Sequence, residues 1–560
     1  MEHADSNFTT PCGSICHPHA LGAFRRHFES EERPKFRNDR INMSLTSNIA
    51  PRLLRPGLLL ATLAFVASVT GCTGLRQWWC QGWKVGPEYS GATASVADNW
   101  RDSEDVRLQG QEQAWDWWRV FDDPNLAHLV LTAFRQNLSL EMASLRVVEA
   151  RRKRQIVAAN LWPQSQTAFG NYTRQQYSRN AVFPPRSMAQ SFDNWSTGFD
   201  LSWELDLWGK IRRAIEAEDA EVEALIDDYD NVLVTLIGDV AATYVEICAF
   251  DERLDLARQN VAIQEGTLEV AKARLDAGRT SQLDVDQARA NLAATEALIP
   301  LLMQGRRQAE NRLAVLLGIT PAEIGTLVAD KRPIPSAPRE VAVGIPANLL
   351  RRRPDVRRAE RTAAAQCARI GIAVADFYPQ FGLNGEIRLN SEEFGDLFSG
   401  DSLAAFITPG FRWQILNYGR IKNNVQIQET RFQQHLVEYE NTVLEAQREV
   451  EDALAQFLRS QERATKLQES VSAMQRAVET AGFQFRQGKI DYDRVFILET
   501  SLVRLQDDYV RAKVEQAIGL IRAFKALGGG WQLARKRAPM ESATFNGQGG
   551  PAPGEKVVRS

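Results

Sequence analysis

Apolar and polar side chains alternate along three stretches of the chain. From Trp195 to Leu207 every second position is apolar or nearly so, and the positions between are small or polar. The same alternation runs through residues 381–390 and 403–415. A period of two places successive side chains on opposite faces of a β-strand. These stretches therefore predict strands with one apolar face and one polar face.

Other stretches have a helical period. Residues 207–266 contain no proline, and their Ala, Glu, Leu, Val and Arg residues have the spacing of a long α-helix. A later apolar stripe steps by three and four residues, which is the period of a coiled coil. Pro300 interrupts this stripe, so a break or kink is expected there. The members of the stripe are Val285, Ala288, Leu292, Thr295, Ile299 and Leu302.

The chain contains an internal repeat with a period of 210 residues. Residues 209–211 recur as 419–421, Gly278 recurs as Gly488, and the helical stripe recurs over 495–512. Repeats of this kind indicate a duplicated structural unit. Val510 stands where the first unit has Pro300, so we expect the two helical hairpins to bend differently.

The repeat also predicts a fourth strand. Residues 161–164 correspond to 377–380 at an offset of 216, so the second unit has a slightly longer loop. The segment after Pro163 alternates less regularly than its counterpart, with Phe169 and Tyr172 out of phase. We assign it as a strand because its repeat counterpart is one.

Strands with an aromatic-rich apolar face and a charged opposite face suit a transmembrane barrel, and the edge of a soluble sandwich is the alternative. Four strands cannot close a barrel alone, and an open edge in hydrocarbon leaves backbone groups unpaired at several kcal/mol each. Several chains are therefore expected to share one barrel. Closure by itself does not fix the copy number.

The start of the chain has the features of an export signal. Arg52 and Arg55 precede an apolar run over 56–68, which is the length of a signal-peptide core. The run ends at Val69-Thr70-Gly71-Cys72, which resembles the lipobox of bacterial lipoproteins. The resemblance implies that Cys72 becomes the acylated mature terminus. Residues 43–71 are then the signal peptide, and residues 1–42 are interpreted as an extension upstream of the true start at Met43.

Composition excludes several classes of protein. The balance of 67 Lys+Arg against 70 Asp+Glu gives a net charge of -3, which argues against a nucleic-acid partner. Six Cys and six His leave few metal ligands or catalytic groups, so we expect no metal, no cofactor and no enzymatic activity. We also expect no apolar stretch of the roughly 18 to 20 residues that a membrane-spanning helix needs.

Four sequence marks resemble the TolC-like outer-membrane efflux family, in its lipoprotein branch of the NodT and OprM type. In their order along the chain, on a duplicated pattern of strands and helices, they cover nearly all of residues 72–531. The marks are Val85-Gly86-Pro87-Glu88-Tyr89, the stretch 117–126 that begins with Trp117-Trp118, Asp206-Leu207-Trp208-Gly209-Lys210, and the arginine-rich stretch 350–357.

The resemblance implies an α+β membrane protein. It is a homotrimer with a shared 12-stranded transmembrane β-barrel, continued by a long periplasmic α-helical coiled-coil barrel. The implied function is the outer-membrane exit duct of a tripartite efflux system for small molecules. The implied partners are outer-membrane lipid, a periplasmic adaptor and an inner-membrane pump of the RND type. The alternatives are the duct of a type I protein secretion system and a lipid-anchored structural coiled coil.

The resemblance also places two helical tips at the periplasmic end. Gly278 and Gly488 suit tight turns because glycine tolerates positive φ. Four basic residues beside them are candidates for adaptor docking: Arg274, Arg279, Arg486 and Lys489.

The entrance gate departs from the family pattern. Members of the family carry an acidic residue nine places after the second tip glycine, where this chain has Ile497, with Asp491, Asp493 and Glu499 nearby. Two interpretations of the gate remain: a hydrophobic constriction at Ile497 and a displaced acidic ring. The three acids can also simply lie on solvated helix faces.

These features divide the chain into expected segments. A lipid-anchored N-terminal segment spans 72–124, the first repeat 125–320, an equatorial linker 321–345 and the second repeat 346–527. A mostly disordered tail follows over 528–560.

Overall fold

The computed structural model describes Trp78 and residues 82–109, 115–178, 180, 191–328, 331–338, 340–342 and 351–534. The proposed extension 1–42, the signal segment 43–71 and Cys72 lie outside the described residues, as does the tail beyond residue 534. The expectations for these segments stay predictions.

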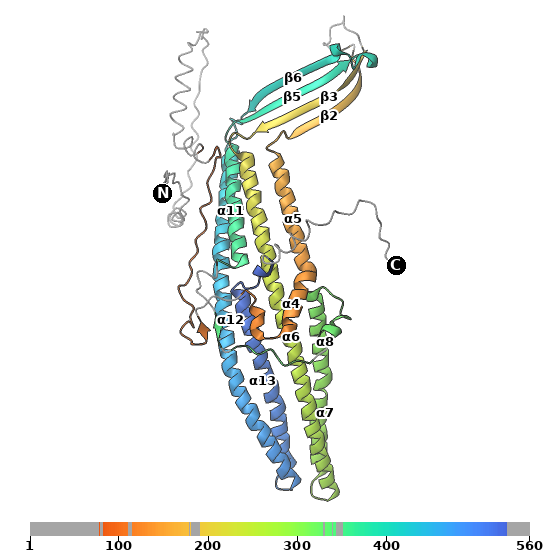
Figure 1. Ribbon diagram of the computed structural model, residues 1–560, viewed down its shortest axis with the longest axis vertical. Helices are drawn as coiled ribbons and strands as arrows, with labels where there is room; N and C mark the ends of the chain where they lie inside the picture. Colours follow the sequence, from red (N-terminus) through yellow and green to blue (C-terminus); the bar gives the residue numbers. More distant parts are fainter. Residues whose placement is uncertain are drawn as a thin grey trace, which may run out of the picture. The chain divides into compact units, whose positions relative to one another are not determined.

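The described residues form long helices and a small number of strands (Figure 1). The α-helices are α4 (Pro124–Gln136), α5 (Leu138–Ala159), α6 (Lys210–Asp276), α7 (Gln282–Glu296), α8 (Leu298–Leu317), α9 (Ile324–Leu327), α11 (Pro354–Ala375), α12 (Arg420–Arg486) and α13 (Tyr492–Ala526). The strands are β1 (Leu108–Gln109), β2 (Ser165–Gln176), β3 (Ser191–Leu205), β4 (Val341–Ala342), β5 (Gln380–Ser391) and β6 (Leu403–Arg412). Short 3-10 helices are η2 (Trp117–Phe121), η3 (Phe394–Asp396) and η4 (Gly400–Ser402).

The chain folds into two compact units that do not follow the repeat boundaries. Among the described residues, the first unit takes those up to Thr93 with 150–222 and 361–436, and the second takes those within 94–149, 223–360 and 437–534. Each unit draws on both repeats. Both α6 and α12 contribute to both units, because their residues fall on either side of these divisions.

The first unit contains a four-stranded antiparallel sheet with the order β2-β3-β5-β6 (Figure 1). All four strands lie where the sequence predicts them. The alternation that continues to Ile415 predicts a longer last strand than the structure has, because β6 ends at Arg412. Strands β2 and β6 form the two edges, and neither pairs with a further strand among the described residues.

The 210-residue period reappears in the helices. Helices α6 and α12 each have 67 residues, and both of their bounds differ by 210. Asp206 accounts for the start of α6, because its carboxylate accepts hydrogen bonds from the backbone N–H groups of Ile211 and Arg212, each at 3.0 Å. An acidic side chain at this position satisfies N–H groups that the first helical turn leaves free.

The two returning helices differ as expected from Pro300. In the first repeat α7 ends at Glu296, and α8 begins at Leu298 with Pro300 in its first turn. A proline fits there because the first backbone N–H groups of a helix have no intrahelical acceptor. In the second repeat α13 runs unbroken through Val510.

The second unit contains the main hydrophobic core. Trp117, Trp118 and Phe121 of η2 pack with apolar side chains of α4, α6, α8, α12 and α13. The rings of Trp117 and Phe524 lie 5.3 Å apart. One sequence mark, the stretch 117–126, therefore supplies core side chains.

Helix α6 corrects one expectation from the sequence. It contains an 18-residue window with a mean hydropathy of 1.7, which is apolar and long enough to cross a membrane. In the structure 72% of that window is buried inside the chain. Its side chains, which include Leu233, Ile237 and Val240, belong to the core of the second unit, so the window is accounted for as a core helix.

Candidate functional site

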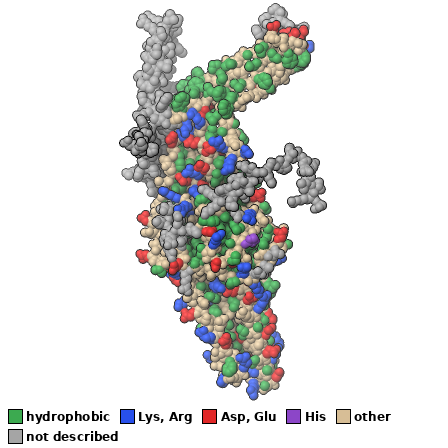
Figure 2. Space-filling view, in the orientation of Figure 1, with side chains coloured by type: hydrophobic (Ala, Val, Ile, Leu, Met, Phe, Trp, Pro, Cys, Tyr) green, Lys and Arg blue, Asp and Glu red, His purple; other side chains and the backbone are tan. Residues whose placement is uncertain are grey.

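One face of the sheet is apolar along three strands. Phe199 of β3 lies opposite Ile387 of β5, which lies opposite Ala405 of β6. One row further, Leu201 and Ile407 flank Gly385. Phe199 is 68% exposed and Ile407 76% exposed, and Figure 2 shows hydrophobic side chains over the sheet. Large apolar side chains this exposed indicate a surface made for lipid or for another chain.

The opposite face of the sheet is polar. Asp200 lies opposite Glu386, and Ser202 donates a hydrogen bond of 2.8 Å to Asn384 across the strands. Phe169 shares this face because it pairs with Gly198, where a side chain would meet the backbone of β5. Tyr172 pairs with Trp195 on the apolar face, with ring centroids 4.3 Å apart. This arrangement explains why Phe169 and Tyr172 are out of phase in the sequence.

Tryptophan side chains fix the junctions between helix and strand in both repeats. The indole N–H of Trp203 donates to the carbonyl of Leu161 at 3.2 Å. Its repeat counterpart Trp413 donates to the carbonyl of Phe377 at 2.9 Å. The same contact made twice is a structural consequence of the duplication, and it uses residues that the 210- and 216-residue offsets relate.

Two arginines that follow the mark 206–210 hold the N-terminal segment in the first unit. Arg212 donates to the carbonyls of Gly82 and Trp83, and the buried Arg213 donates to those of Val85 and Gly86. Gly86 lies so close to α11 that a Cβ atom there would be 2.4 Å from the Cα of Gly371. The mark 85–89 thereby provides the carbonyls of Val85 and Gly86 that accept hydrogen bonds from Arg213.

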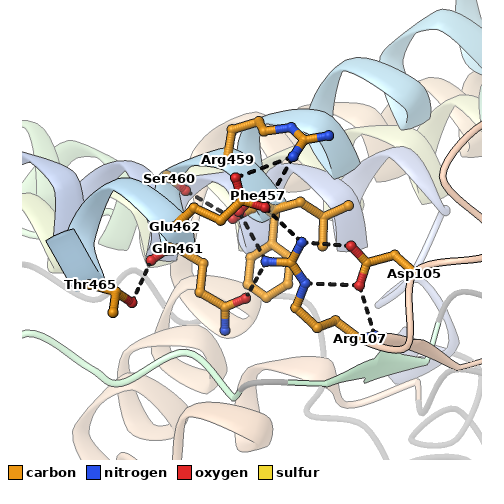
Figure 3. Close-up of polar contacts among 9 residues, drawn as sticks. Asp105, Arg107, Phe457, Arg459, Ser460, Gln461, Glu462 and Thr465 are labelled. Carbon is orange, nitrogen blue, oxygen red and sulfur yellow. Dashed lines mark hydrogen bonds and ion pairs between the residues drawn. The ribbon is translucent and has the colours of Figure 1, made fainter.

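A second group of contacts fixes the same segment within the second unit (Figure 3). Arg107 donates to both carboxylate oxygens of Asp105, at 2.9 and 2.6 Å, and to Gln461 and Glu462 of α12 at 3.1 and 3.0 Å. The Arg107 guanidinium lowers the pKa of the Asp105 carboxyl to about 2. The backbone N–H of Arg101 also donates to Glu451 of α12. This part of the N-terminal segment therefore follows one face of α12.

Arg353, in the arginine-rich mark 350–357, contacts the C-terminal end of α13. Arg353 donates to the carbonyl of Ala526, the last residue of that helix, at 2.7 Å, and it pairs with Asp355 and Glu449. Arg357 pairs with Asp227 and Asp230 of α6 and lies over the ring of Trp531. Basic groups at the C-terminal end of a helix satisfy its free carbonyls.

Both predicted tips are tight turns at glycine. Gly278 and Gly488 have φ of +67° and +76°, and nothing lies within 4 Å of where a Cβ would stand on either. In the first tip the N–H of Arg279 donates to the carbonyl of Arg274 at 2.8 Å, and in the second the N–H of Lys489 donates to that of Gln484 at 3.0 Å. This pattern is the Schellman motif, which ends helices at a glycine with positive φ.

The basic residues at the tips divide into two kinds. Arg279, Arg486 and Lys489 are exposed beside the glycines. Arg274 is half-buried, donates to the carbonyls of Phe485 and Ile490, and lies 4.6 Å above the ring of Phe485. Arg274 therefore joins the first tip to the second, which the sequence pattern did not indicate.

The gate candidates also differ in their exposure to solvent. Ile497 is 56% exposed, Asp493 is exposed on the same helix, and Asp491 is exposed at the N-cap position directly before it. Glu499 is only 3% exposed and accepts hydrogen bonds from Thr267 at 2.7 Å and Asn291 at 3.1 Å. Glu499 is therefore enclosed by α6, α7 and α13 within the single chain and does not lie on a solvated helix face.

The residues that the structure describes contain no cluster of three or more His, Cys, Asp or Glu side chains that could hold a metal ion. A cavity of about 450 Å³ lies beside α6 and α8 in the second unit. Its acidic residues Asp251 and Glu310 both pair with Arg306. Burial raises the pKa of the nearby Cys248 thiol to about 12. These groups are engaged in internal contacts of the fold.

A sheet with one apolar face and two open edges, followed by helices of 67 residues, defines the class of outer-membrane channel proteins. A comparison with protein families agrees. The chain belongs to the outer membrane efflux protein family, whose model matches residues 129–319 and 345–529. The identification from the four sequence marks is confirmed.

Individual relatives are also outer-membrane proteins. The chain is 31% identical over 420 residues to the pyoverdine export outer membrane protein OpmQ of Pseudomonas putida, covering 74% of this chain and 88% of the relative. It is 28% identical to the probable outer membrane lipoprotein SilC of Salmonella typhimurium, covering 85% and 99% of the two chains. The solved outer-membrane channel OprN superposes with a TM-score of 0.75 at 30% identity, covering 80% and 99%.

The chain is thus an outer-membrane efflux channel with a periplasmic helical portion, as the sequence predicted. The family and these relatives are transport proteins.

Proposed function

We propose that three copies of this chain form the exit duct of a tripartite efflux system that carries small molecules from the periplasm to the exterior. The proposal of a shared assembly rests on the exposure of strand β6. All ten of its residues are exposed in the single chain, including Leu403, Ile407 and Phe411. Such a strand needs a partner on its open edge. A neighbouring copy of β2 provides one and would give a 12-stranded barrel.

A stripe on α5 supports the same assembly. Its members lie on one side of the helix, three, four or eight residues apart, and all are exposed in the single chain. Exposed apolar side chains aligned on one side of a helix favour an interface between chains. The members are Leu138 at 66%, Met142 at 56%, Leu145 at 59%, Val148 at 47% and Ile156 at 70% exposure.

The tips are the proposed docking surface for a periplasmic adaptor. Arg279, Arg486 and Lys489 give this surface a positive charge, and the turns at Gly278 and Gly488 present them to a partner. Arg274 is proposed to act indirectly, by keeping the two tips together. The family resemblance adds an inner-membrane pump of the RND type behind the adaptor.

The gate is proposed to involve Ile497 or the exposed acids Asp491 and Asp493. Ile497 is a large apolar side chain left exposed on α13, which supports a hydrophobic constriction. The acids support a cation-attracting ring, because like charges around a narrow pore favour cations. Both sets lie near the second tip.

Cys72 is proposed to be the acylated mature terminus. The lipobox resemblance supports this. The relative SilC, which aligns over 99% of its own length, is named a probable outer membrane lipoprotein. Two or more acyl chains give stable membrane anchoring where one chain is marginal. Small molecules as cargo are supported by the name of OpmQ, a pyoverdine export protein.

The function is tested in cells that contain the adaptor and pump but lack every other outer-membrane efflux channel. We expect expression of this chain to lower the steady-state accumulation of a fluorescent efflux dye. A variant with Gly278→Val and Gly488→Val should reach the outer membrane and leave accumulation high, because β-branched residues strain both docking turns. Equal accumulation with and without the wild-type chain at normal membrane levels would contradict the proposal.

A further inference from the structure

Glu499 has no role in the function described so far. It lies on α13 and is 3% exposed, between α6 and α7 of the same chain. It forms no ion pair with any residue that the structure describes. A buried carboxyl without a cation is costly when ionised, so its protonation state affects the contact in which it is buried.

The contact between α6 and α13 is a series of polar pairs spaced by seven residues. Asn260 donates to Gln506 at 2.7 Å, and Thr267 donates to Glu499 at the same distance. Seven residues is the repeat at which one side of each helix faces the other in a coiled coil. Polar side chains at such positions fix the register and weaken the association compared with apolar ones. At the far end of the series Lys513 pairs with Glu252 and Arg253 with Asp507.

The hydrogen-bond partners of Glu499 fit a protonated carboxyl. The Thr267 hydroxyl lies 2.7 Å from Glu499 and 3.1 Å from the carbonyl of Ile263. It has one proton. When Glu499 is protonated, its O–H can donate to Thr267, which donates to Ile263, while Asn291 donates to the second carboxyl oxygen. When Glu499 is ionised, Thr267 must turn to the carboxylate, and the Ile263 carbonyl loses this donor.

The groups around Glu499 do not compensate its charge. On α13 the neighbouring heptad positions are Tyr492 and Gln506, and on α7 the neighbours are Asn291 and, beside Tyr492, Asp284. On α6 Lys272 is exposed, and Arg274 donates to the carbonyls of Phe485 and Ile490. Burial raises the pKa of the Glu499 carboxyl, and the hydrogen bonds from Thr267 and Asn291 oppose that rise.

We propose that Glu499, with Thr267 and Asn291, forms a proton-dependent contact that positions α13 against α6 and α7. Protonation strengthens this contact and favours the closed periplasmic end, and ionisation weakens it. The consequence for the entrance rests on the proposed channel function. The contact itself is a property of the single chain.

The direction with pH follows from the raised pKa. Packed helices favour the protonated form, and separated helices expose a carboxyl with its ordinary value of 4.5. The contact is therefore strongest at low pH. It weakens as pH rises from that ordinary value to the higher value in the packed state, and then stays constant. Each pKa unit of difference corresponds to about a tenfold change in the equilibrium between packed and separated helices.

Hydrogen exchange of the detergent-solubilised protein tests the contact without requiring channel activity. Protection factors correct for the pH dependence of the chemical exchange rate. We expect protection of 492–506 to fall between pH 5 and pH 8 in the wild type, by about tenfold per pKa unit, and to stay at the pH 5 level in Glu499→Gln. Glu269→Gln, which changes an exposed carboxyl on α6, should behave as the wild type. An equal fall in wild type and Glu499→Gln would overturn the proposal.

A second pair of variants distinguishes the loss of this hydrogen bond from a general loss of structure. Thr267→Val removes the hydroxyl and should lower protection at both pH values, while Thr267→Ser should keep the wild-type level and pH profile. Equal protection in all three proteins would refute the hydrogen-bond scheme.

Conductance in planar bilayers then tests the entrance. The open fraction should rise with pH in the wild type and remain low in Glu499→Gln. A wild type that conducts with the same pH profile as Glu499→Gln contradicts the role in closure. A wild type that never conducts contradicts the channel function, and the exchange result still decides the contact.

Discussion

At the residue scale, the family marks act as structural contacts. Arg213 and Arg353 are both nearly fully buried, and both donate to backbone carbonyls of distant segments. A guanidinium suits this task because it remains charged and offers several donors in a fixed plane. Replacing either arginine would leave these carbonyls without that donor inside the fold.

Gly86 offers a test of this close packing. Gly86 and Gly91 have nearly equal φ, +88° and +90°, but only Gly86 has a neighbour where its Cβ would stand, 2.4 Å from the Cα of Gly371. Alanine at either position carries the strain of a left-handed residue, roughly 1 to 2 kcal/mol. We expect Gly86→Ala to lose about 1 to 3 kcal/mol more than Gly91→Ala, because the backbone of α11 must move. Thermal unfolding in detergent measures this, and equal melting of the two variants would contradict it.

At the element scale, the repeats share the first long helix and differ in the second. The matched bounds of α6 and α12 follow from equivalent start and tip glycines. The break between α7 and α8 follows from one proline that α13 lacks. A single residue therefore decides whether the returning helix is continuous.

Exchanging the proline between the repeats tests this. Pro300→Ala should change the unfolding free energy by less than about 1 kcal/mol, because Pro300 occupies a first turn where no hydrogen bond is lost. Val510→Pro should destabilise by about 3 kcal/mol or more, because it removes a hydrogen bond in the middle of α13 and disturbs a fully buried position. Val510→Ala separates the lost packing from the proline effect. Circular dichroism at increasing denaturant measures all three, and equal losses for the two proline changes would contradict the expectation.

At the scale of the whole molecule, the single chain leaves surfaces that require a partner. The open edges of the sheet and the apolar stripe of α5 are exposed together in one chain. Backbone groups at a sheet edge inside a membrane have no water to pair with. A closed assembly of identical chains satisfies them, since each open edge meets the opposite edge of the next copy.

Native mass spectrometry of the membrane-extracted protein should show three copies, each beginning at Cys72 with added acyl mass. Leu145→Lys should shift the population toward monomer, because it places a charge in the α5 interface while leaving the fold of the single chain intact. Arg146→Glu, exposed outside the stripe, should remain trimeric. A trimeric Leu145→Lys protein would remove α5 from the interface, and a chain without acyl mass would contradict lipidation.

The sequence by itself determined the elements and the family. Alternation predicted three strands and the repeat predicted the fourth, the 210-residue period related α6 to α12, Gly278 and Gly488 marked the turns, and Pro300 marked a break. Apart from the repeat, these features are local, because a strand, a turn or a helix end depends on residues within a few positions of one another.

The tertiary structure decided which side chains face one another. Glu499 is buried because Thr267 and Asn291 meet it from two other helices, more than 200 residues away in the chain. Arg274 joins the two tips, and Phe169 lies on the polar face because the strand register pairs it with Gly198. The periodicity of one segment specifies a face but not what packs against it. Burial, pairing and protonation depend on that partner, so only the folded chain determines them.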